Sequence, residues 1–536
     1  MPISRKEFII GSGAALLPVS WARAALSESA APRGAAAPAG PCFNAREFGA
    51  KGDGQAKDTR ALQGAVDAAG ANGGTVWLPP GNYLCGTLRL KSHVALALDA
   101  GATLAFSPDN ADFAPVEKLG FKTFADEETS DFHHALLRGE GLEHVSVVGP
   151  GTIDGNRQKR HGPKPIALRN CRHVTVRGLV IRNSPNYNLS LLGCDHVCVE
   201  GVTILNGHCD GIDPDCCRDV RIANCFVESW DDAIVPKASF ALGHRRSSEN
   251  ITVTNCVLTS ACNCFKLGTE SSGDFKNVTL SNCTMFARPD LWGRRPSSGV
   301  SIEMVDGASL ERVAISNLVM ADVESPVFVR LGNRGRAQAV PRPDHLAGLC
   351  LSNIVATGAS RASAITGVPG FPVRGITLSH LRIACAGGGS ARLARKAVPE
   401  SERQYPDADM FGDLPVYGLF CRHAEGLILD DVEFRLEQPD ARPALFLDAV
   451  ADVQLRSMAA APPAGDEPVA WLHNARRCFL QGLRALPGTG TLFKVTGAET
   501  ARLVALANDF SEAKFPFQFG PEVSPSALRQ EANVIA

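Results

Sequence analysis

The chain has 536 residues, of which 45% are hydrophobic and 21% charged, a composition typical of a folded protein with a large core. Its formal net charge of -2 gives no basic surplus, which argues against nucleic acid or an anionic membrane as a partner. At this length we expect either several domains or one extended repeat architecture.

The first residues have the pattern of an export signal. Arg5-Lys6 precedes an apolar run from Phe8 to Val19, and Ala22-Arg23-Ala24 matches a small-residue cleavage site. Residues Ser4–Ile10 resemble the twin-arginine export motif, with lysine in place of the second arginine. The apolar run is too short to span a bilayer, so we expect a signal peptide that is removed and leaves no membrane anchor.

Export defines the expected domain organisation. The signal peptide covers residues 1–24, and the Ala/Pro-rich stretch 25–41 is interpreted as a linker. The folded domain is then predicted over residues 42–520, in a periplasmic or secreted protein.

Short strands of alternating apolar residues recur along the rest of the chain. Val174-Thr175-Val176, Val197-Cys198-Val199 and Val220-Arg221-Ile222 are about 23 residues apart, and similar triplets continue to Val453-Gln454-Leu455. Such strands are too short to fold alone, but stacked coils bury their apolar faces against one another. The pattern therefore predicts an all-β fold, a single right-handed parallel β-helix. Leucine-rich repeats share the period but need a Leu-x-x-Leu-x-Leu frame that is missing.

The 17 cysteines are interpreted as buried apolar residues rather than a disulfide framework, because their number is odd and their spacing is not paired. Those that follow an asparagine at the repeating position predict an interior ladder: Cys171, Cys225, Cys256 and Cys283. Zinc would require a second pair of ligands beside Cys194/Cys198 or Cys262/Cys264. We expect no metal and no cofactor.

Two groups of motifs carry a family resemblance. The stretch Phe43–Gly54, with Val76–Tyr83, is similar to the helical N-terminal cap of pectin-degrading β-helix enzymes. Further on, His208-Cys209-Asp210-Gly211-Ile212-Asp213 and Trp230-Asp231-Asp232-Ala233-Ile234 resemble the N-T-D and D-D motifs of the polygalacturonase family, glycoside hydrolase family 28. The resemblance covers roughly residues 42–335, with catalytic motifs expected within 183–335.

Asp210, Asp231 and Asp232 are the predicted catalytic residues. Asp210 and Asp231 are about one coil apart, so stacking can place them on adjacent rungs. Asp231 and Asp232 can share a site only where the backbone turns or bulges. Like charges in such a cluster favour one protonated acid beside ionised bases, as glycoside hydrolysis requires. The resemblance implies that Asp231 protonates the leaving oxygen while Asp210 and Asp232 position and deprotonate water, with inversion. Turn capping or calcium binding by these residues is the alternative.

Two departures from the family pattern concern substrate binding. Ala261–Lys266 lacks the histidine of the family's G-H-G motif, and Ser301-Ile302-Glu303 replaces its basic R-I-K motif. Arg330 and Arg334 could grip a uronate carboxylate instead, or form ordinary groove salt bridges. The predicted substrate-binding residues are His208, Lys237, Lys266, Glu270, Glu303, Arg330 and Arg334.

These observations predict an exported glycoside hydrolase that cleaves a pectic or related, uronate-containing polysaccharide or oligosaccharide, its only expected partner. A non-catalytic carbohydrate-binding β-helix is one alternative, favoured by the missing histidine and basic pair. A polysaccharide lyase is the other. The segment Tyr405–Gly412 is expected to be a loop beside the groove, and an exo-acting enzyme needs such a wall.

Overall fold

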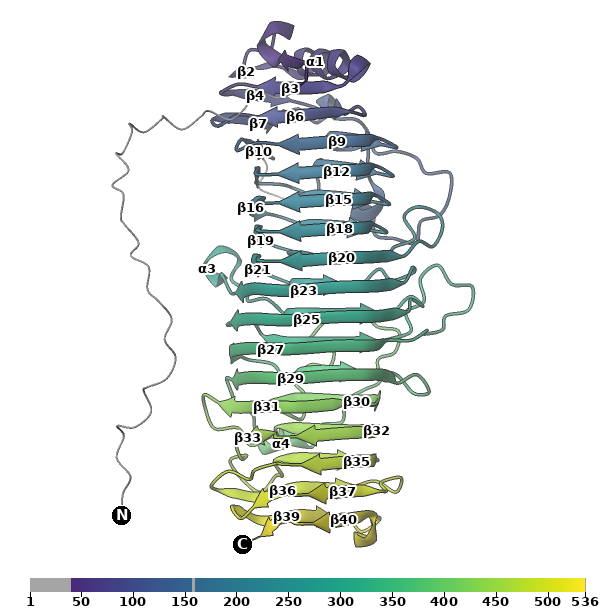
Figure 1. Cartoon of the computed structure of the whole chain (residues 1–536), viewed down its shortest axis with the longest axis vertical. Coiled ribbons are helices and arrows are strands. Elements are labelled where there is room, and N and C mark those ends of the chain that lie inside the picture. Colours follow the sequence, from purple (N-terminus) through teal and green to yellow (C-terminus); the bar gives the residue numbers. More distant parts are fainter. Residues whose placement is uncertain (1–39, 157–159, 536) are drawn as a thin grey trace, which may run out of the picture. The chain divides into compact units, whose positions relative to one another are not determined.

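Successive short strands pair in parallel, each with the strand one coil earlier and the strand one coil later. Val174 pairs with Val197, Val197 with Val220, and Val220 with Ile251. The strands of the computed structural model therefore stack rung upon rung (Figure 1). Their apolar side chains point inward and form one continuous core along the stack. The parallel β-helix predicted from the repeat is confirmed.

The structure describes residues 40–156 and 160–535. The predicted signal peptide, 1–24, and all of the linker except Gly40 and Pro41 lie outside the described residues. None of the described helices is both long and apolar enough to span a bilayer.

The strands form three columns. The first column contains β1 (Cys42–Asn44), β3 (Gly74–Leu78), β6 (Val94–Leu98), β9 (Glu143–Val148), β12 (Arg172–Arg177), β15 (Asp195–Glu200), β18 (Arg218–Ala223), β20 (Ser248–Thr254), β23 (Phe275–Phe286), β25 (Leu310–Ala321), β27 (Ala347–Ala359), β29 (Val373–Cys385), β31 (Ile428–Leu436), the C-terminal half of β32 (Leu445–Arg456), β35 (Arg476–Gln481), β37 (Leu503–Leu506) and β40 (Leu528–Glu531).

The second column begins with short strands and then continues through the C-terminal halves of β23, β25, β27, β29 and β31. Its separate strands are β2 (Asp53–Lys57), β4 (Gly81–Cys85), β7 (Ala102–Phe106), β10 (Thr152–Asp154), β13 (Val180–Arg182), β16 (Thr203–Gly207), β19 (Phe226–Ser229), β21 (Val257–Ser260), β33 (Ala459–Ala460), β38 (Asp509–Phe510) and β41 (Val534–Ile535).

The third column, which we call the site column, carries the polar residues predicted from the motifs. It contains β5 (Leu88–Arg89), β8 (Ala135–Glu140), β11 (Lys164–Arg169), β14 (Leu189–Leu192), β17 (Ile212–Asp215), β22 (Asn263–Leu267), β24 (Ser298–Met304), β26 (Ser325–Leu331), β28 (Ser363–Thr366), β30 (Leu419–Glu425), β32 (Leu445–Arg456), β34 (Ala470–His473), β36 (Thr489–Thr496) and β39 (Ala513–Phe519). Isolated bridges from Ile234 to Ile212 and to Phe265 join β17 to β22.

Helices are few and lie outside the columns. Helix α1 (Thr59–Asn72) covers the N-terminal end of the stack with its apolar residues Leu62, Ala65, Val66 and Ala69, as the predicted helical cap requires (Figure 1). The remaining helices are single turns: α2 (Glu127–Ser130), α3 (Pro289–Trp292), α4 (Ala391–Ala394), η1 (Ala45–Phe48), η2 (Asn110–Asp112) and η3 (Pro525–Ala527).

Asparagines turn two of the corners, and cysteines follow them into the core. Asn170 lies between β11 of the site column and β12 of the first column, whereas Asn224, Asn255 and Asn282 lie between the first and second columns. Asn170, Asn224, Asn255 and Asn282 all have left-handed φ angles near +55°, a conformation that asparagine tolerates well. The cysteines that follow them are buried, and all 17 cysteines are free thiols. Cys225, Cys256 and Cys283 stack on successive coils as predicted, whereas Cys171 lies at the other corner, in register with Cys194. No disulfide joins them.

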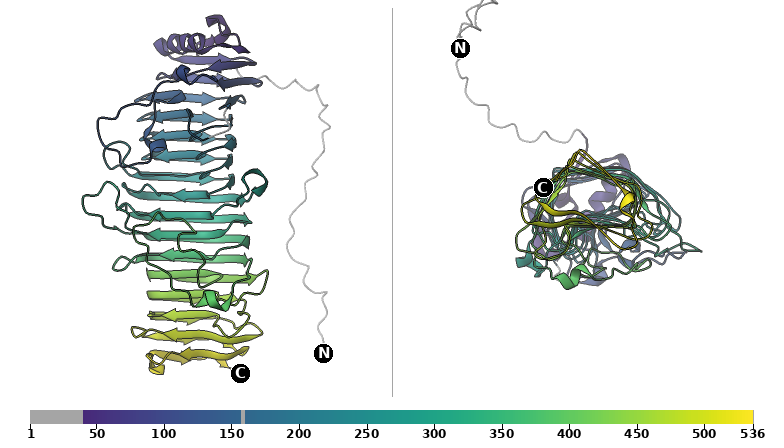
Figure 2. Two further views of the ribbon diagram at one scale, coloured as in Figure 1. Left: turned by 180° about the vertical axis from the view of Figure 1, so that it is seen from behind. Right: turned by 90° about the horizontal axis from the view of Figure 1, so that it is seen from below.

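Two long insertions leave the stack and lie over the site column. Residues 107–134 interrupt the chain between β7 and β8, and residues 386–418 interrupt it between β29 and β30. The second insertion packs Phe411 and Leu414 with Phe328 of β26 in a separate apolar cluster. Seen along the axis, the coils superpose around the core, while the connecting segments project from the outline (Figure 2).

Candidate active site

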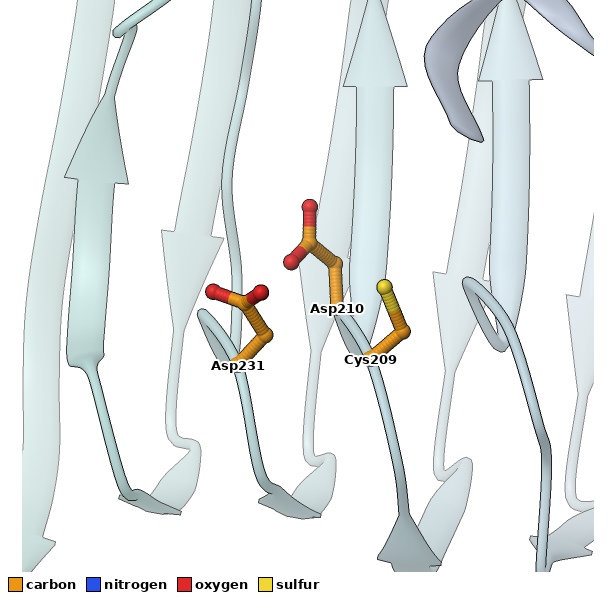
Figure 3. A group of neighbouring side chains, drawn as sticks. All are labelled: Cys209, Asp210 and Asp231. Atoms are coloured by element: carbon orange, nitrogen blue, oxygen red, sulfur yellow. The ribbon is translucent and has the colours of Figure 1, made fainter. Parts of the chain in front are cut away.

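The three predicted catalytic carboxylates lie where successive coils enter the site column. Asp210 lies between β16 and β17, and Asp231 and Asp232 lie between β19 and the bridge at Ile234. Ile212 pairs with Ile234, so Asp210 is in register with Asp232 on the next coil. Figure 3 shows Asp210 and Asp231 side by side on neighbouring coils.

A tight turn brings Asp231 and Asp232 into one site although they are consecutive. The hydroxyls of Ser229 and Ser260 each donate a hydrogen bond of 2.7 Å to the carbonyl oxygen of Asp231. The backbone N–H of Asp232 donates to Asp231 Oδ1 at 3.1 Å. The turn that the sequence requires at this point is thus fixed by two serines from adjacent coils.

Each carboxylate contacts a different cation. Lys237 Nζ lies 2.8 Å from Asp210 Oδ2 and 2.9 Å from Asp213 Oδ2. Lys266 Nζ lies 3.2 Å from Asp232 Oδ2. The third pair links Arg160 Nη1 to Asp231 Oδ2 at 2.8 Å. These ion pairs offset the repulsion among three neighbouring carboxylates.

Burial divides the carboxylates into two kinds. The side chains of Asp210 and Asp232 are 4% and 5% exposed, whereas that of Asp231 is 22% exposed. Loss of solvent raises the pKa of Asp210 well above its ordinary value, against the opposing charge of Lys237. The same desolvation raises the pKa of Asp213 to about 6. Asp231 is the most exposed of the three carboxylates.

Lys266 and Glu303 form a second buried layer behind Asp232. Glu303 Oε2 lies 3.4 Å from Lys266 Nζ and accepts a hydrogen bond of 2.9 Å from Thr269 Oγ1. Burial raises the pKa of Glu303 to about 7 despite the nearby charge of Lys266. Glu303 is thus a buried partner of Lys266, with no exposed surface of its own.

The carboxylates line a cavity of about 90 Å³ that both insertions enclose. In the first insertion, the Asp126 backbone N–H and Thr129 Oγ1 donate hydrogen bonds of 2.7 Å to Glu270. In the second, the Tyr405 hydroxyl lies 2.9 Å from Thr269 Oγ1. The lining residues are Asp126, Glu128, Arg160, Tyr187, Asp210, Asp231, Asp232, Lys237, Lys266, Thr269, Glu270 and Tyr405.

Of the seven predicted substrate-binding residues, Lys237, Lys266 and Glu270 line this cavity. His208 is absent from the lining; its Nε2 is buried and has no hydrogen-bond partner among the described residues, and burial lowers its pKa.

The structure places the two predicted uronate-binding arginines in structural contacts. Arg330 donates to Thr366 Oγ1 at 3.2 Å, to the Gly367 carbonyl at 2.9 Å and to the Glu400 carbonyl at 2.6 Å. Arg334 donates from Nε to Asp306 Oδ1 at 2.9 Å and from Nη2 to the Thr269 carbonyl at 3.0 Å. Neither is a lining residue of the cavity.

Sequence reasoning missed Arg160, Glu128 and Asp126, and it treated Tyr405 only as part of a loop. Asp126, Arg160 and Tyr405 lie in irregular segments and Glu128 lies in the single turn α2, all outside the strand columns. The repeat that aligns the site column says nothing about where such segments fold. The only signal for these four residues in the sequence is that charged residues are concentrated in the segments between strands.

One cluster of possible metal ligands overlaps the site. Ligand atoms of Cys209, Asp210 and Asp231 lie within 4.8 Å of one another (Figure 3). Lys237 and Arg160 already neutralise the two carboxylates, however, and burial raises the pKa of the Cys209 thiol well above its ordinary value. A neutral thiol beside two ion-paired carboxylates does not fit a metal centre, because metal ligands must be deprotonated and free to coordinate.

Comparison with known proteins agrees with the arrangement. The family model described as "Glycosyl hydrolases family 28" matches residues 114–400, and one described as "Rhamnogalacturonase A/epimerase, pectate lyase-like" matches residues 42–104. A probable polygalacturonase from Vitis vinifera is 27% identical over 368 residues, covering 63% of this chain and 73% of that protein. An exopolygalacturonase from Platanus acerifolia is 24% identical over 381 residues, covering 65% and 92%. A hyperthermoactive exopolygalacturonase from Thermotoga maritima shares the fold, with a TM-score of 0.56 and 20% identity over 73% of this chain and 92% of that one.

Proposed function

Because the chain belongs to family 28 of the glycosyl hydrolases, we propose that it removes uronate residues from a pectic chain by inverting acid/base hydrolysis in the cavity of Asp210, Asp231 and Asp232. The observation that carries the proposal is the meeting of three carboxylates from two coils in one enclosed cavity, each beside its own cation. Such a set can supply an acid and a base at once.

The roles follow from exposure and contacts. Asp231, the most exposed of the three, protonates the leaving glycosidic oxygen. Asp210 and Asp232 are held by Lys237 and Lys266, and together they orient and deprotonate the attacking water. Oxygens of Asp210 and Asp231 lie within 4.8 Å, closer than the roughly 6.5–9.5 Å between the carboxyl groups of most inverting pairs. In the proposed mechanism the attacking water therefore binds beside Asp210 and Asp232 rather than between Asp210 and Asp231.

Exo action is the second part of the proposal. The insertions 107–134 and 386–418 close the cavity through Glu270 and Thr269, and a wall on each side admits a chain end rather than a chain interior.

Export completes the proposal, since a pectic polymer is met outside the cytoplasm. The predicted signal peptide at residues 1–24 is the observation that supports export. Fractionation of cells that express the full chain, followed by N-terminal sequencing, should find the protein outside the cytoplasm and cleaved near Ala24. An uncut cytoplasmic protein would contradict this part.

The test of activity is incubation of the purified protein with polygalacturonate and its oligomers. We expect products that each contain one added water, release of short products from chain ends, and an inverted anomer in the first minutes of proton NMR. Unsaturated products would instead identify a lyase, a mixture of intermediate lengths an endo-acting enzyme, and a retained anomer a different mechanism. Binding without any product would identify a carbohydrate-binding protein.

A further inference from the structure

We propose that Arg160 senses the substrate's carboxylate: it holds the proton donor Asp231 in the empty cavity and releases it when a uronate takes over its guanidinium. This inference rests on the proposed hydrolysis of uronate chains and names how that site selects them.

Arg160 is the exchangeable cation of the three that face the carboxylates. Its side chain is 32% exposed, whereas those of Lys237 and Lys266 are 7% and 5% exposed. Lys237 is also committed to Asp213 at 2.9 Å and to the Tyr187 hydroxyl at 2.9 Å. An incoming carboxylate therefore meets Arg160 first and finds the lysines fully engaged.

The Arg160 contact is incompatible with proton donation by Asp231. Arginine carries only donor groups and keeps its charge, so Asp231 Oδ2, 2.8 Å from Nη1, serves as an acceptor. The other oxygen, Oδ1, accepts the backbone N–H of Asp232 at 3.1 Å. Asp231 cannot present an O–H to a glycosidic oxygen from Oδ2 until Arg160 moves away.

Arg160 also limits the space available. The enclosed volume of about 90 Å³ is well below the ~300–1,000 Å³ of ordinary ligand pockets. The guanidinium lies 5.7 Å from the centre of the Trp230 ring and forms its second ion pair with Glu128 Oε1 at 3.1 Å. Movement of the Arg160 side chain toward a bound carboxylate would enlarge the cavity. Arg160 could keep its ion pair with Glu128 during this movement.

A carboxylate is the group that can cause this exchange. Two oxygens of a uronate match the forked N–H groups of arginine and replace one charge-assisted contact by another. A neutral sugar or a methyl ester offers no such replacement, so Asp231 would stay paired. Binding of the acidic sugar and release of the catalytic proton donor would then be one event.

The decisive experiment is calorimetric titration with D-galacturonate, which cannot be hydrolysed, and with its methyl ester. Asp231→Asn removes the charge that retains Arg160, so we expect this variant to bind galacturonate about 10-fold more tightly than the wild type. Its affinity for the methyl ester should not change. Arg160→Gln should bind galacturonate at least 10-fold more weakly than the wild type.

The double variant separates release of Arg160 from simple relief of charge repulsion. If Arg160 is the sensor, Asp231→Asn gives no gain in galacturonate affinity in the Arg160→Gln background. A gain that persists there, or equal changes for acid and ester, would overturn the proposal. Arg182→Gln is the matched control, because Arg182 pairs with Asp154 at 2.8 Å outside the cavity, and it should bind like the wild type. Thermal melting checks that each variant is folded.

Turnover distinguishes the two proposals. Arg160→Gln should lose kcat/KM on digalacturonate by about 10–100-fold, and its preference for the acid over the methyl ester should shrink. If the wild type hydrolyses no pectic substrate but the binding results hold, the proposed hydrolysis fails and the sensor stands as a binding device. If the wild type hydrolyses pectic substrates and Arg160→Gln keeps the same preference for the acid over the methyl ester, the sensor proposal is overturned and the proposed hydrolysis stands.

Discussion

At the scale of single residues, the site is defined by which cation each carboxylate contacts. Asp210 and Asp232 are buried against lysines, and Asp231 is held at the cavity surface by an arginine. The same chemical group thereby has a different exposure and a different partner at each position, which is what the proposed division of roles requires.

The first prediction concerns the proton donor. Asp231→Asn preserves volume but removes the acid, and we expect turnover of a pectic substrate to fall by about 10²–10⁴-fold. The melting temperature should stay close to that of the wild type. Asp219→Asn, an exposed carboxylate in the first column, is the control and should keep full activity. Nearly full activity in the Asp231 variant would exclude it from the mechanism.

The second prediction concerns Glu303 and pH. Its folded-state pKa of about 7 lies above the ordinary 4.5, so between these values the folded state binds more protons than the unfolded state. The contribution of Glu303 to stability is therefore lost as pH rises from 4.5 to 7. Melting temperatures of the wild type and Glu303→Gln across this range should show a steeper decline for the wild type. Parallel curves would contradict the assignment.

At the scale of elements, the insertions are attached to the site column by particular side chains. Arg330 of β26 binds the Gly367 and Glu400 carbonyls and so ties the second insertion to the stack. This explains why an arginine that the sequence suggested for substrate binding is buried.

The third prediction follows from that attachment. Arg330→Ala leaves the buried Gly367 carbonyl and the partly buried Glu400 carbonyl without this donor and should lower stability by roughly 1.5–3 kcal/mol. The activity of the variant should fall equally on acidic and neutral substrates, because the change loosens the second insertion and leaves the recognition of charge intact. Urea denaturation measures the first effect and paired kinetic assays the second. A loss of activity on uronate substrates alone would instead indicate that Arg330 contacts the substrate directly.

The fourth prediction concerns a histidine stack on the first column. His144, His173 and His196 stack at centroid distances of 4.4 and 4.8 Å. Partial desolvation and the two neighbouring imidazoles lower the pKa of His173 below its ordinary value. In acid the unfolded state therefore binds more protons, and stability falls as pH drops below about 6.5. His173→Asn, which tolerates the φ of 55°, should reduce the difference in melting temperature between pH 7.5 and 5.5.

At the scale of the whole stack, the sequence predicted the features that repeat from coil to coil. Triplets such as Val197-Cys198-Val199 indicated the fold because every coil must present the same apolar face. The spacing of the Asp210 and Asp231 motifs placed both residues on adjacent rungs for the same reason, and the family they resembled is confirmed by the family match. Arg160 and Tyr405 could not be placed, because their positions depend on tertiary contacts of irregular segments with no period.

The in-register stack separates two kinds of evolutionary change. Removing one residue within a strand of the site column would shift the residues that follow it in that strand to the opposite face and break the register with the neighbouring coils. The insertions at 107–134 and 386–418 begin and end between strands, so their length and sequence can vary while the pairing of Ile212 with Ile234 is kept. The chemistry of bond cleavage is thus inherited with the coils, and the choice of substrate can diverge through the insertions without altering it.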